Sequence, residues 1–387
     1  MKITFVTDTY FPQANGVATT LVQLVKGLRD RGHEIDIIRP AVLACEEAGL
    51  KVASVGLPGY KDVRFGFPIK LVLQTRWYKK RPDVIYIATE TPLGASAVSA
   101  ARALGIPAAS GFHTNFQQYV AHYQLPLLEK ATLKYLRHVH NRSTCTFVPS
   151  RDVIVDLERR GFENLELLPK GVDTKLFSPK KRSQLLRGKW GVREGGVVGL
   201  YVGRIAAEKN LPVILRTFLE IRKRIPDFRG VFVGDGPKLE ELRKEHPQFI
   251  YAGEKRGEEL AEFYASADVF VFPSTTETFG NVTMEAMASG LAVVAYDYAA
   301  ARQHIINGEN GFSVPFDEED SFIETAILAA QSDVSELRQK ARASARKVRW
   351  KKVIKRFEKN LKNLVSENSG ETADTRSPQP RTTSQGI

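Results

Sequence analysis

Cysteine is scarce in this sequence, and so are long apolar runs. The 387 residues include two cysteines, Cys45 and Cys145, which form neither a Cys-x-x-Cys pair nor a disulfide framework. We therefore expect a reducing compartment. No uninterrupted apolar run approaches transmembrane length, and the first residues, MKITFVTDTYFPQ, lack the apolar segment and cleavage site of a signal peptide. These absences predict a cytoplasmic protein.

Acidic residues are too few to balance the basic ones, and the excess of basic residues is concentrated in the first half of the sequence. The net charge is +12; residues 1–182 carry 26 Lys and Arg against 16 Asp and Glu, whereas residues 183–387 carry 30 against 28. A basic first half could meet anionic lipid, nucleic acid or a phosphorylated substrate, although a generally basic proteome would give the same balance. Zinc-ligand spacing, an aromatic RNP pattern and a recognisable helix-turn-helix are missing, which disfavours a nucleic-acid binder.

The sequence does contain a regular alternation of strand-like and helix-like segments. Lys2–Thr7 is a short apolar run, and Gly16–Arg31 repeats apolar residues at helical spacing. A second cycle starts near Gly195, with GGVVGLYVGR as a strand and NLPVILRTFLEIRKRI as a helix. Each cycle predicts a parallel sheet with helices on both faces, so the chain is expected to be an α/β protein with two doubly wound domains.

The polar, basic segment SPKKRSQLLRGKWGVREG separates the two cycles. We expect an N-terminal domain at 1–182 and a C-terminal domain at 183–345, with a ligand cleft at the carboxyl ends of the strands. A helix is expected at about 346–365, where apolar residues recur at helical spacing. The tail, 366–387, is rich in Ser, Thr, Pro and Gly without an apolar pattern, so it is expected to be disordered.

Two glutamates flank a predicted helix start in FPSTTETFGNVTMEAMASG. Glu277 lies in the loop after the strand DVFVFPS, Gly280 and Asn281 open the helix, and Glu285 lies about one turn inside it. The amides and positive dipole end of a helix suit a phosphate, and a carboxylate beside them can hold ribose hydroxyls. Alone, the pair is better explained as acidic residues placed favourably at an exposed helix start.

Other strand ends carry matching residues. Arg204 follows the strand GLYVG and Lys209 comes five residues later, so both could neutralise a diphosphate; a weak surface ion pair with Glu208 is the alternative. In the first half, Asn15-Gly16 begins a helix after the first strand. His113 follows the strand in IPAASGFHT and could bond the transferred sugar, although a lone histidine is more often structural.

These motifs together resemble the family 4 retaining glycosyltransferases, which have the GT-B fold. The resemblance rests on Glu277-x7-Glu285 with VGRIAAEKN, VGDGP, GVDTKLF and NGV, and it covers roughly Lys2 to Leu364. It implies two Rossmann-like domains facing a cleft and a last helix that crosses back onto the first domain. It also implies catalysis without a bound metal or other cofactor, and no Asp-x-Asp metal signature stands at a cleft position.

The resemblance also implies roles for individual residues. Glu277 would contact hydroxyls of the donor sugar and Glu285 would hold the ribose. His113 would correspond to the active-site histidine near that sugar. The following residues would bind the donor nucleotide-sugar, mainly at its diphosphate: Asn15, Gly16, Arg204, Lys209, Phe279, Gly280 and Asn281.

Within the family, the chain looks most like GDP-mannose-dependent α-mannosyltransferases and diacylglycerol-type glycolipid synthases. This resemblance implies hexose transfer from a GDP-mannose or UDP-glucose type donor to a membrane glycolipid or diacylglycerol acceptor. The basic segments TRWYKKRPD, with Trp77 and Tyr78, and LLEKATLKYLRHVHNR could rest on the inner face of an anionic membrane; core packing with solvated charge explains them equally. A soluble-acceptor or polysaccharide transferase remains an alternative, and a nucleotide-sugar 2-epimerase a remote one.

Overall fold

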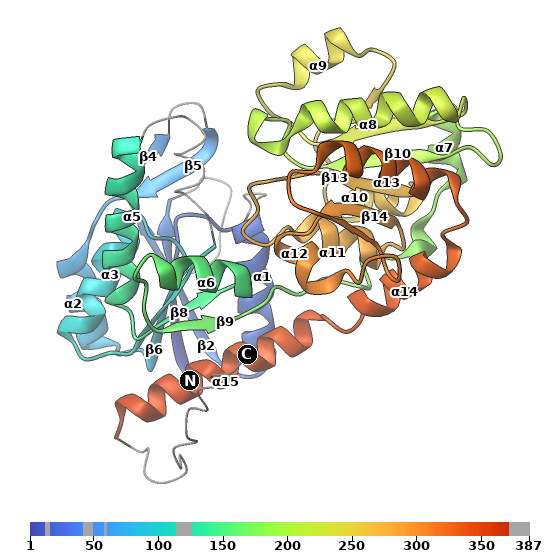
Figure 1. Cartoon of the computed structure of the whole chain (residues 1–387). Helices are drawn as coiled ribbons and strands as arrows, with labels where there is room; N and C mark the ends of the chain where they lie inside the picture. The colour runs from blue at the N-terminus through green and yellow to red at the C-terminus, as the bar shows by residue number, and fades with distance from the viewer. Residues whose placement is uncertain (12–15, 42–48, 58–59, 114–125, 371–387) are drawn as a thin grey trace, which may run out of the picture.

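The computed structural model describes residues 1–11, 16–41, 49–57, 60–113 and 126–370, and it holds two parallel sheets flanked by helices (Figure 1). Asn15 and residues 371–387, most of the expected tail, lie outside the described residues. The last strand of the first sheet ends at Leu167 and the first strand of the second begins at Val198. Each sheet therefore corresponds to one of the two cycles seen in the sequence.

The first sheet has seven strands in the order β3-β2-β1-β6-β7-β8-β9, and every neighbouring pair is parallel. The strand order reverses between β1 and β6, which is the point where doubly wound sheets bind ligands. The elements of this half are β1 (Lys2–Val6), α1 (Gly16–Arg29), β2 (Glu34–Pro40), β3 (Leu50–Val52), β4 (Ser54–Leu57), β5 (Tyr60–Gly66), α2 (Lys70–Lys79), β6 (Val84–Ile87), α3 (Pro92–Ala103), β7 (Ala108–Gly111), α5 (Pro126–Asn141), β8 (Cys145–Val148), α6 (Arg151–Arg159) and β9 (Leu165–Leu167).

The second sheet has six parallel strands in the order β12-β11-β10-β13-β14-β15. Its order reverses between β10 and β13, as in a dinucleotide-binding fold. The elements are η1 (Pro179–Lys181), α7 (Gln184–Lys189), β10 (Val198–Val202), η2 (Ala207–Lys209), α8 (Leu211–Arg224), β11 (Arg229–Val233), α9 (Leu239–Glu245), β12 (Ile250–Tyr251), α10 (Gly257–Ser266), β13 (Val269–Phe272), α11 (Asn281–Ala288), β14 (Ala292–Tyr296), α12 (Ala299–His304), β15 (Phe312–Val314), α13 (Glu319–Gln331) and α14 (Ser335–Ala345).

An antiparallel hairpin, β4–β5, stands apart from the two large sheets. The sequence pattern does not predict this hairpin, because its strands are short and lack a clear apolar alternation. The amide of Gly66, at its end, donates to the buried carboxylate of Asp8, just after β1. This bond ties the hairpin to the carboxyl edge of the first sheet.

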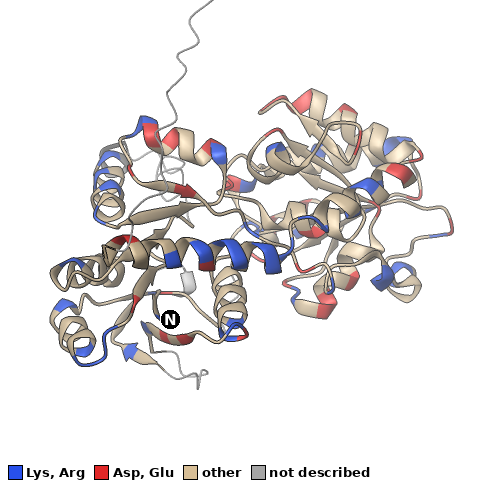
Figure 2. Ribbon diagram, turned by 90° about the horizontal axis from the view of Figure 1, so that it is seen from below, with Lys and Arg blue, Asp and Glu red and all other residues tan. Residues whose placement is uncertain are grey.

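The last helix, α15 (Trp350–Asn368), packs on the first sheet, as the resemblance implied. Phe357 is fully buried against the rings of Phe5, Tyr86 and Phe147. The contact with α1 is close, because a Cβ at Gly27 would lie 2.2 Å from the Cδ1 atom of Ile354. Seen from below in Figure 2, α15 carries Lys and Arg on its outward face. The chain thus returns to the first sheet after completing the second.

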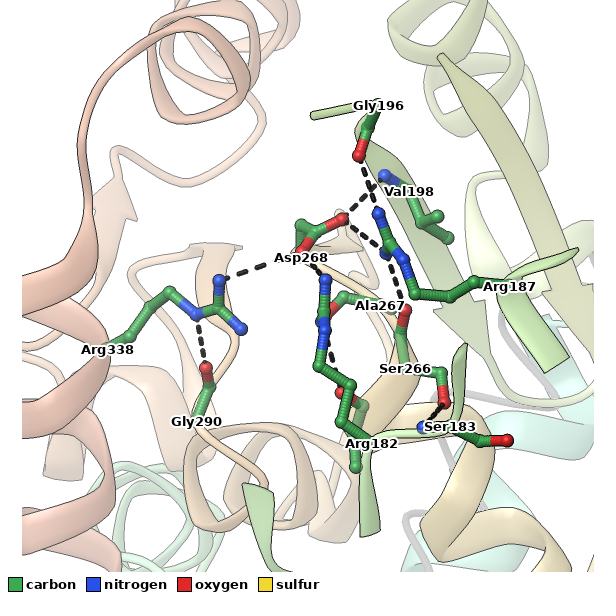
Figure 3. Close-up of polar contacts among 11 residues, drawn as sticks. Arg182, Ser183, Arg187, Gly196, Val198, Ser266, Ala267, Asp268, Gly290 and Arg338 are labelled. Carbon is green, nitrogen blue, oxygen red and sulfur yellow. Dashed lines mark hydrogen bonds and ion pairs between the residues drawn. The ribbon is translucent and has the colours of Figure 1, made fainter. Parts of the chain in front are cut away.

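A cluster of arginines around Asp268 attaches the connecting segment to the second sheet (Figure 3). Asp268 directly precedes β13, and its carboxylate accepts from Arg182 at 2.8 Å, from Arg187 at 2.9 Å and from the backbone of Val198 at 2.9 Å. Arg338 of α14 lies 3.6 Å away. This cluster is at the amino end of the strands, so it anchors the segment opposite the strand ends that carry the predicted site.

Candidate active site

The amino ends of two helices, one from each half, meet at the junction of the sheets. Gly280 precedes α11 with a positive φ of 86°, a conformation that favours glycine. A Cβ at Gly16, the first residue of α1, would lie 3.4 Å from the Nδ2 atom of Asn281. The Oδ1 atom of Asn281 is buried and has no hydrogen-bond partner among the described residues. Two positive dipole ends at one place favour an anionic ligand.

A buried ion pair lies beside this place. The ammonium of Lys209 is 2.5 Å from the Oε1 atom of Glu277, and the hydroxyl of Ser274 donates to the same oxygen at 2.8 Å. Lys209 follows β10 and Glu277 follows β13, the two strands that flank the reversal of strand order. The residues are 68 positions apart in the chain, and the sheet order brings them together.

Arg204 lies on the same edge, directly after β10. Its guanidinium is 3.4 Å from the Oε1 atom of Glu208, so the alternative ion pair does form. Glu208 is only 5% exposed, however, so this is not a solvated surface pair. A partly exposed arginine held over a buried carboxylate keeps its orientation and still presents donors to a ligand.

The VGDGP turn after β11 supports this loop. A Cβ at Gly234 would lie 1.9 Å from the carbonyl oxygen of Gly203, so any side chain there would displace the backbone before Arg204. The amide of Ile205 donates to the carbonyl of Asp235 at 2.9 Å. The turn therefore positions the Arg204 loop through backbone contacts.

Glu285 points toward α10 within the second half. Its Oε2 atom accepts a hydrogen bond of 3.0 Å from the hydroxyl of the fully buried Tyr264. Burial raises the pKa of the Glu285 carboxyl to about 7, and the bond from Tyr264 opposes this rise. A carboxylate with one protein donor can accept further bonds from ligand hydroxyls.

His113 follows β7 on the side of the first sheet. Its Nε2 atom is 2.6 Å from the hydroxyl of Tyr86, and its buried Nδ1 atom has no hydrogen-bond partner in the described ranges. Burial lowers the pKa of the imidazole to about 3, and the charge of Lys170 contributes to this effect. The ring is therefore neutral at physiological pH, and its free nitrogen can bond a hydroxyl.

The structure also places three further residues of these segments. The side chain of Phe279 is 1% exposed and packs in the core, so only its backbone could face a ligand. Glu90 is buried and lies 3.2 Å from the imidazole of His140, which places it in an internal network. Trp77 is 1% exposed and its ring fills the core beneath α2, which for this residue supports core packing, one of the two explanations of its segment.

Sequence reasoning missed Lys170, Ser274 and Tyr264. Ser274 and Tyr264 bond the two predicted glutamates, but neither has a local signature. Lys170 precedes the GVD motif and is 7% exposed; its charge helps to lower the pKa of His113, and the carboxylate of Glu277 acts on the pKa of Lys170 itself. Only the tertiary structure shows this proximity.

The part of the chain that the structure describes holds no helix long and apolar enough to cross a membrane. Within the same ranges, no group of three or more His, Cys, Asp or Glu side chains gathers in a way that could hold a metal ion.

Two family profiles match most of the chain. The profile described as Glycosyltransferase Family 4 matches residues 14–176, and the one described as Glycosyl transferases group 1 matches residues 196–332.

Similar proteins cover most of the chain as well. A GDP-mannose-dependent alpha-mannosyltransferase from Mycobacterium tuberculosis is 32% identical over 82% of this chain and 85% of its own. The sulfoquinovosyl transferase SQD2 from Arabidopsis thaliana is 32% identical over 90% and 70%, and an alpha-monoglucosyldiacylglycerol synthase from Acholeplasma laidlawii is 29% identical over 82% and 86%. Among solved structures, sucrose-phosphate synthase from Thermosynechococcus elongatus has a TM-score of 0.77 and 19% identity, covering 95% of this chain and 99% of that one.

Proposed function

We propose that this chain moves a hexose to a membrane lipid. The chain belongs to glycosyltransferase family 4, has the GT-B fold and is a glycosyltransferase. The donor is a nucleoside-diphosphate sugar of the GDP-mannose or UDP-glucose type. The acceptor is a hydroxyl of a glycolipid or diacylglycerol, and the product is an α-glycoside formed with retention. The names of relatives support this proposal: one specifies GDP-mannose, one specifies a glucosyldiacylglycerol product, and both of these specify an alpha linkage.

One observation on this chain's own residues supports the proposal most directly. Lys209 and Glu277 form a pair of 2.5 Å at the strand-order reversal, beside the amino ends of α1 and α11. Cations and helix amides together match a diphosphate, and a carboxylate next to them matches sugar hydroxyls. Glu285 lies on α11 where ribose hydroxyls would approach.

The chemistry follows from this charge distribution. As the glycosidic bond to phosphate breaks, negative charge grows on the diphosphate, and fixed cations and amides stabilise it without reorganisation. We propose that Arg204, Lys209 and the start of α11 supply this stabilisation without a metal ion. The acceptor hydroxyl attacks from the face of the leaving phosphate, which takes up its proton. His113 orients the sugar through its unpartnered Nδ1 atom.

An apolar surface of the first half is the proposed membrane face. Leu71 is 76% exposed and Val72 is 52% exposed on α2, and Phe67, three residues before this helix, is 50% exposed. Exposed Lys70 and Lys79 stand at the two ends of α2. Apolar side chains rimmed by lysines suit an anionic bilayer surface, and they replace Trp77 as the inserted groups.

The function is tested by a donor screen. The full chain is incubated with GDP-mannose, UDP-glucose, UDP-galactose or UDP-glucuronate and with liposomes containing diacylglycerol and anionic lipid, and the lipids are read by mass spectrometry. We expect a monoglycosylated lipid from one donor, cleaved by an α-glycosidase and not by a β-glycosidase. Transfer only to a soluble saccharide would support the polysaccharide alternative, and a β-linked product would refute retention.

The membrane face is tested separately by flotation. The double variant Leu71→Glu/Val72→Glu should lose most binding to anionic liposomes, because both side chains are exposed and can be changed without disturbing the core. Leu185→Glu is the matched control, since Leu185 is 74% exposed on α7 in the other half. Equal liposome binding by the double variant and by Leu185→Glu would show that Leu71 and Val72 do not form a membrane face.

A further inference from the structure

Lys170 is a buried lysine in the segment that leaves the first sheet. It follows β9 by three positions and is 7% exposed. Its side chain lines a small pocket together with His113, Phe147 and Trp350. The pocket lies where the first sheet, the connecting segment and α15 meet, beneath the junction that carries the donor-site residues.

The charges around Lys170 come from both halves of the chain. Burial lowers the pKa of its ammonium to about 8, and the carboxylate of Glu277 opposes this change. At neutral pH the group is therefore still a cation. Its charge also helps to lower the pKa of His113. Lys170 thus lines one pocket with His113 of the first half and interacts electrostatically with Glu277 of the second.

The other two cations of the site have carboxylate partners within the protein. Arg204 pairs with Glu208 and Lys209 pairs with Glu277. For Lys170, the described residues provide neither a hydrogen bond nor an ion pair to the ammonium. A buried charge without a partner is costly, and an anion bound beside it offsets that cost.

We propose that Lys170 is a third cation of the donor site and that its ammonium contacts an anionic oxygen of the donor. The inference rests on the proposed function, since it takes a nucleotide-sugar as the ligand. The oxygen belongs either to the diphosphate or to an acidic group on the transferred hexose. Either source fits the pocket that Lys170 shares with His113, the residue that orients the transferred sugar in the proposed function.

A purely packing role is the competing explanation. Lys170 lines the same pocket as Phe147 and Trp350, and lysine stems often cover apolar surface. Lys170→Met keeps such a stem and removes the charge, so a packing role predicts that this variant behaves like the wild type. Lys170→Arg keeps the charge and should retain part of the binding.

Calorimetry on the full chain distinguishes the two roles. Uridine, UDP, UDP-glucose and UDP-glucuronate, with the matching guanosine ligands, are titrated into the wild type and the variants. Lys175→Met is the control, because Lys175 is exposed in the same segment. A lost charge-assisted hydrogen bond corresponds to roughly ten- to a hundredfold in affinity. We expect Lys170→Met to lose this factor for ligands with the relevant anion and to bind the nucleosides unchanged.

The ligand series identifies the source of the oxygen. Weaker binding of UDP itself assigns the contact to the diphosphate, whereas weakening confined to UDP-glucuronate assigns it to the hexose. Wild-type affinity of Lys170→Met for every ligand would overturn the inference, and so would equal weakening of nucleosides and nucleotides. No acceptor is needed, so a missing lipid product would refute the proposed function while leaving this result standing. Failure of every nucleotide to bind the wild type would refute both.

Discussion

Replacing Glu285 with glutamine should stabilise the protein above neutral pH and weaken its binding of nucleotides. The Glu285 carboxyl is half-buried in α11 and accepts one hydrogen bond, from Tyr264 at 3.0 Å. Burial raises its pKa from 4.5 to about 7. The folded protein therefore holds this proton more strongly than the unfolded chain does.

The size of the effect follows from the pKa values. A rise from 4.5 to about 7 corresponds to about 3 kcal/mol, at roughly 1.4 kcal/mol for each tenfold change. Below pH 4.5 the carboxyl is protonated in both states and no penalty exists. Between pH 4.5 and 7 the unfolded chain ionises first, so the free energy of unfolding falls as the pH rises. Above pH 7 the full loss of about 3 kcal/mol remains.

Urea unfolding at pH 4, 5.5, 7 and 8 measures this difference. Glutamine cannot ionise, so Glu285→Gln should lack this fall and exceed the wild type at pH 8 by up to about 3 kcal/mol. Glu240→Gln, on the exposed surface of α9, is the control. Parallel pH profiles for the wild type and Glu285→Gln would refute the burial argument.

The same carboxyl should respond to ligand. Ribose hydroxyls that donate to the carboxylate favour its ionised form and lower its pKa. Nucleotide binding near pH 6.5 should then release a proton, which calorimetry in buffers of different ionisation enthalpy detects. Glu285→Gln should bind UDP or GDP more weakly and release no proton. Unchanged affinity in this variant would remove Glu285 from the proposed ribose site.

Three further predictions concern the transfer reaction and the fold. Lys209→Met should lower kcat/KM by at least about a hundredfold with unchanged circular dichroism, because it removes a cation of the diphosphate site. The control, Lys223→Met, changes an exposed residue of α8 and should leave kcat/KM unchanged. Near wild-type transfer by Lys209→Met would show that Lys209 does not belong to the site. Asp268→Asn should cost about 3 kcal/mol in urea unfolding, since three guanidinium groups lose their shared counter-charge, and a loss under 1 kcal/mol would contradict this role. Phe357→Ala should cost about 3–5 kcal/mol by opening a cavity under the first sheet, and a stability equal to the wild type would show that α15 is held elsewhere.

Much of the site was predictable because its residues follow strands. Parallel strands place their carboxyl ends at one edge, so Arg204, Glu277 and His113 could be assigned to sheet edges from the positions of the strands alone. Gly280 and Asn281 were recognisable because a glycine before an apolar helical repeat indicates a helix start. These are local signals, and the structure gives each residue the position that the local signal indicated.

The remaining features depend on contacts between distant segments. Trp77 sits in a basic stretch that looks exposed, yet its ring is buried because the rest of the chain covers that side of α2. The Asp268 cluster joins segments more than 80 positions apart. No periodicity or motif encodes such pairings, so sequence reasoning could not supply them.

The sequence by itself therefore determined the parallel α/β architecture and the helix start between Glu277 and Glu285, because these depend on the spacing of neighbouring residues. The tertiary structure decided that Lys209 meets Glu277, that α11 faces α1, and that the buried Lys170 lines a pocket with His113. The physical reason is that strand order and the return of α15 set these distances, and both arise from packing of the whole chain rather than from any short stretch of it.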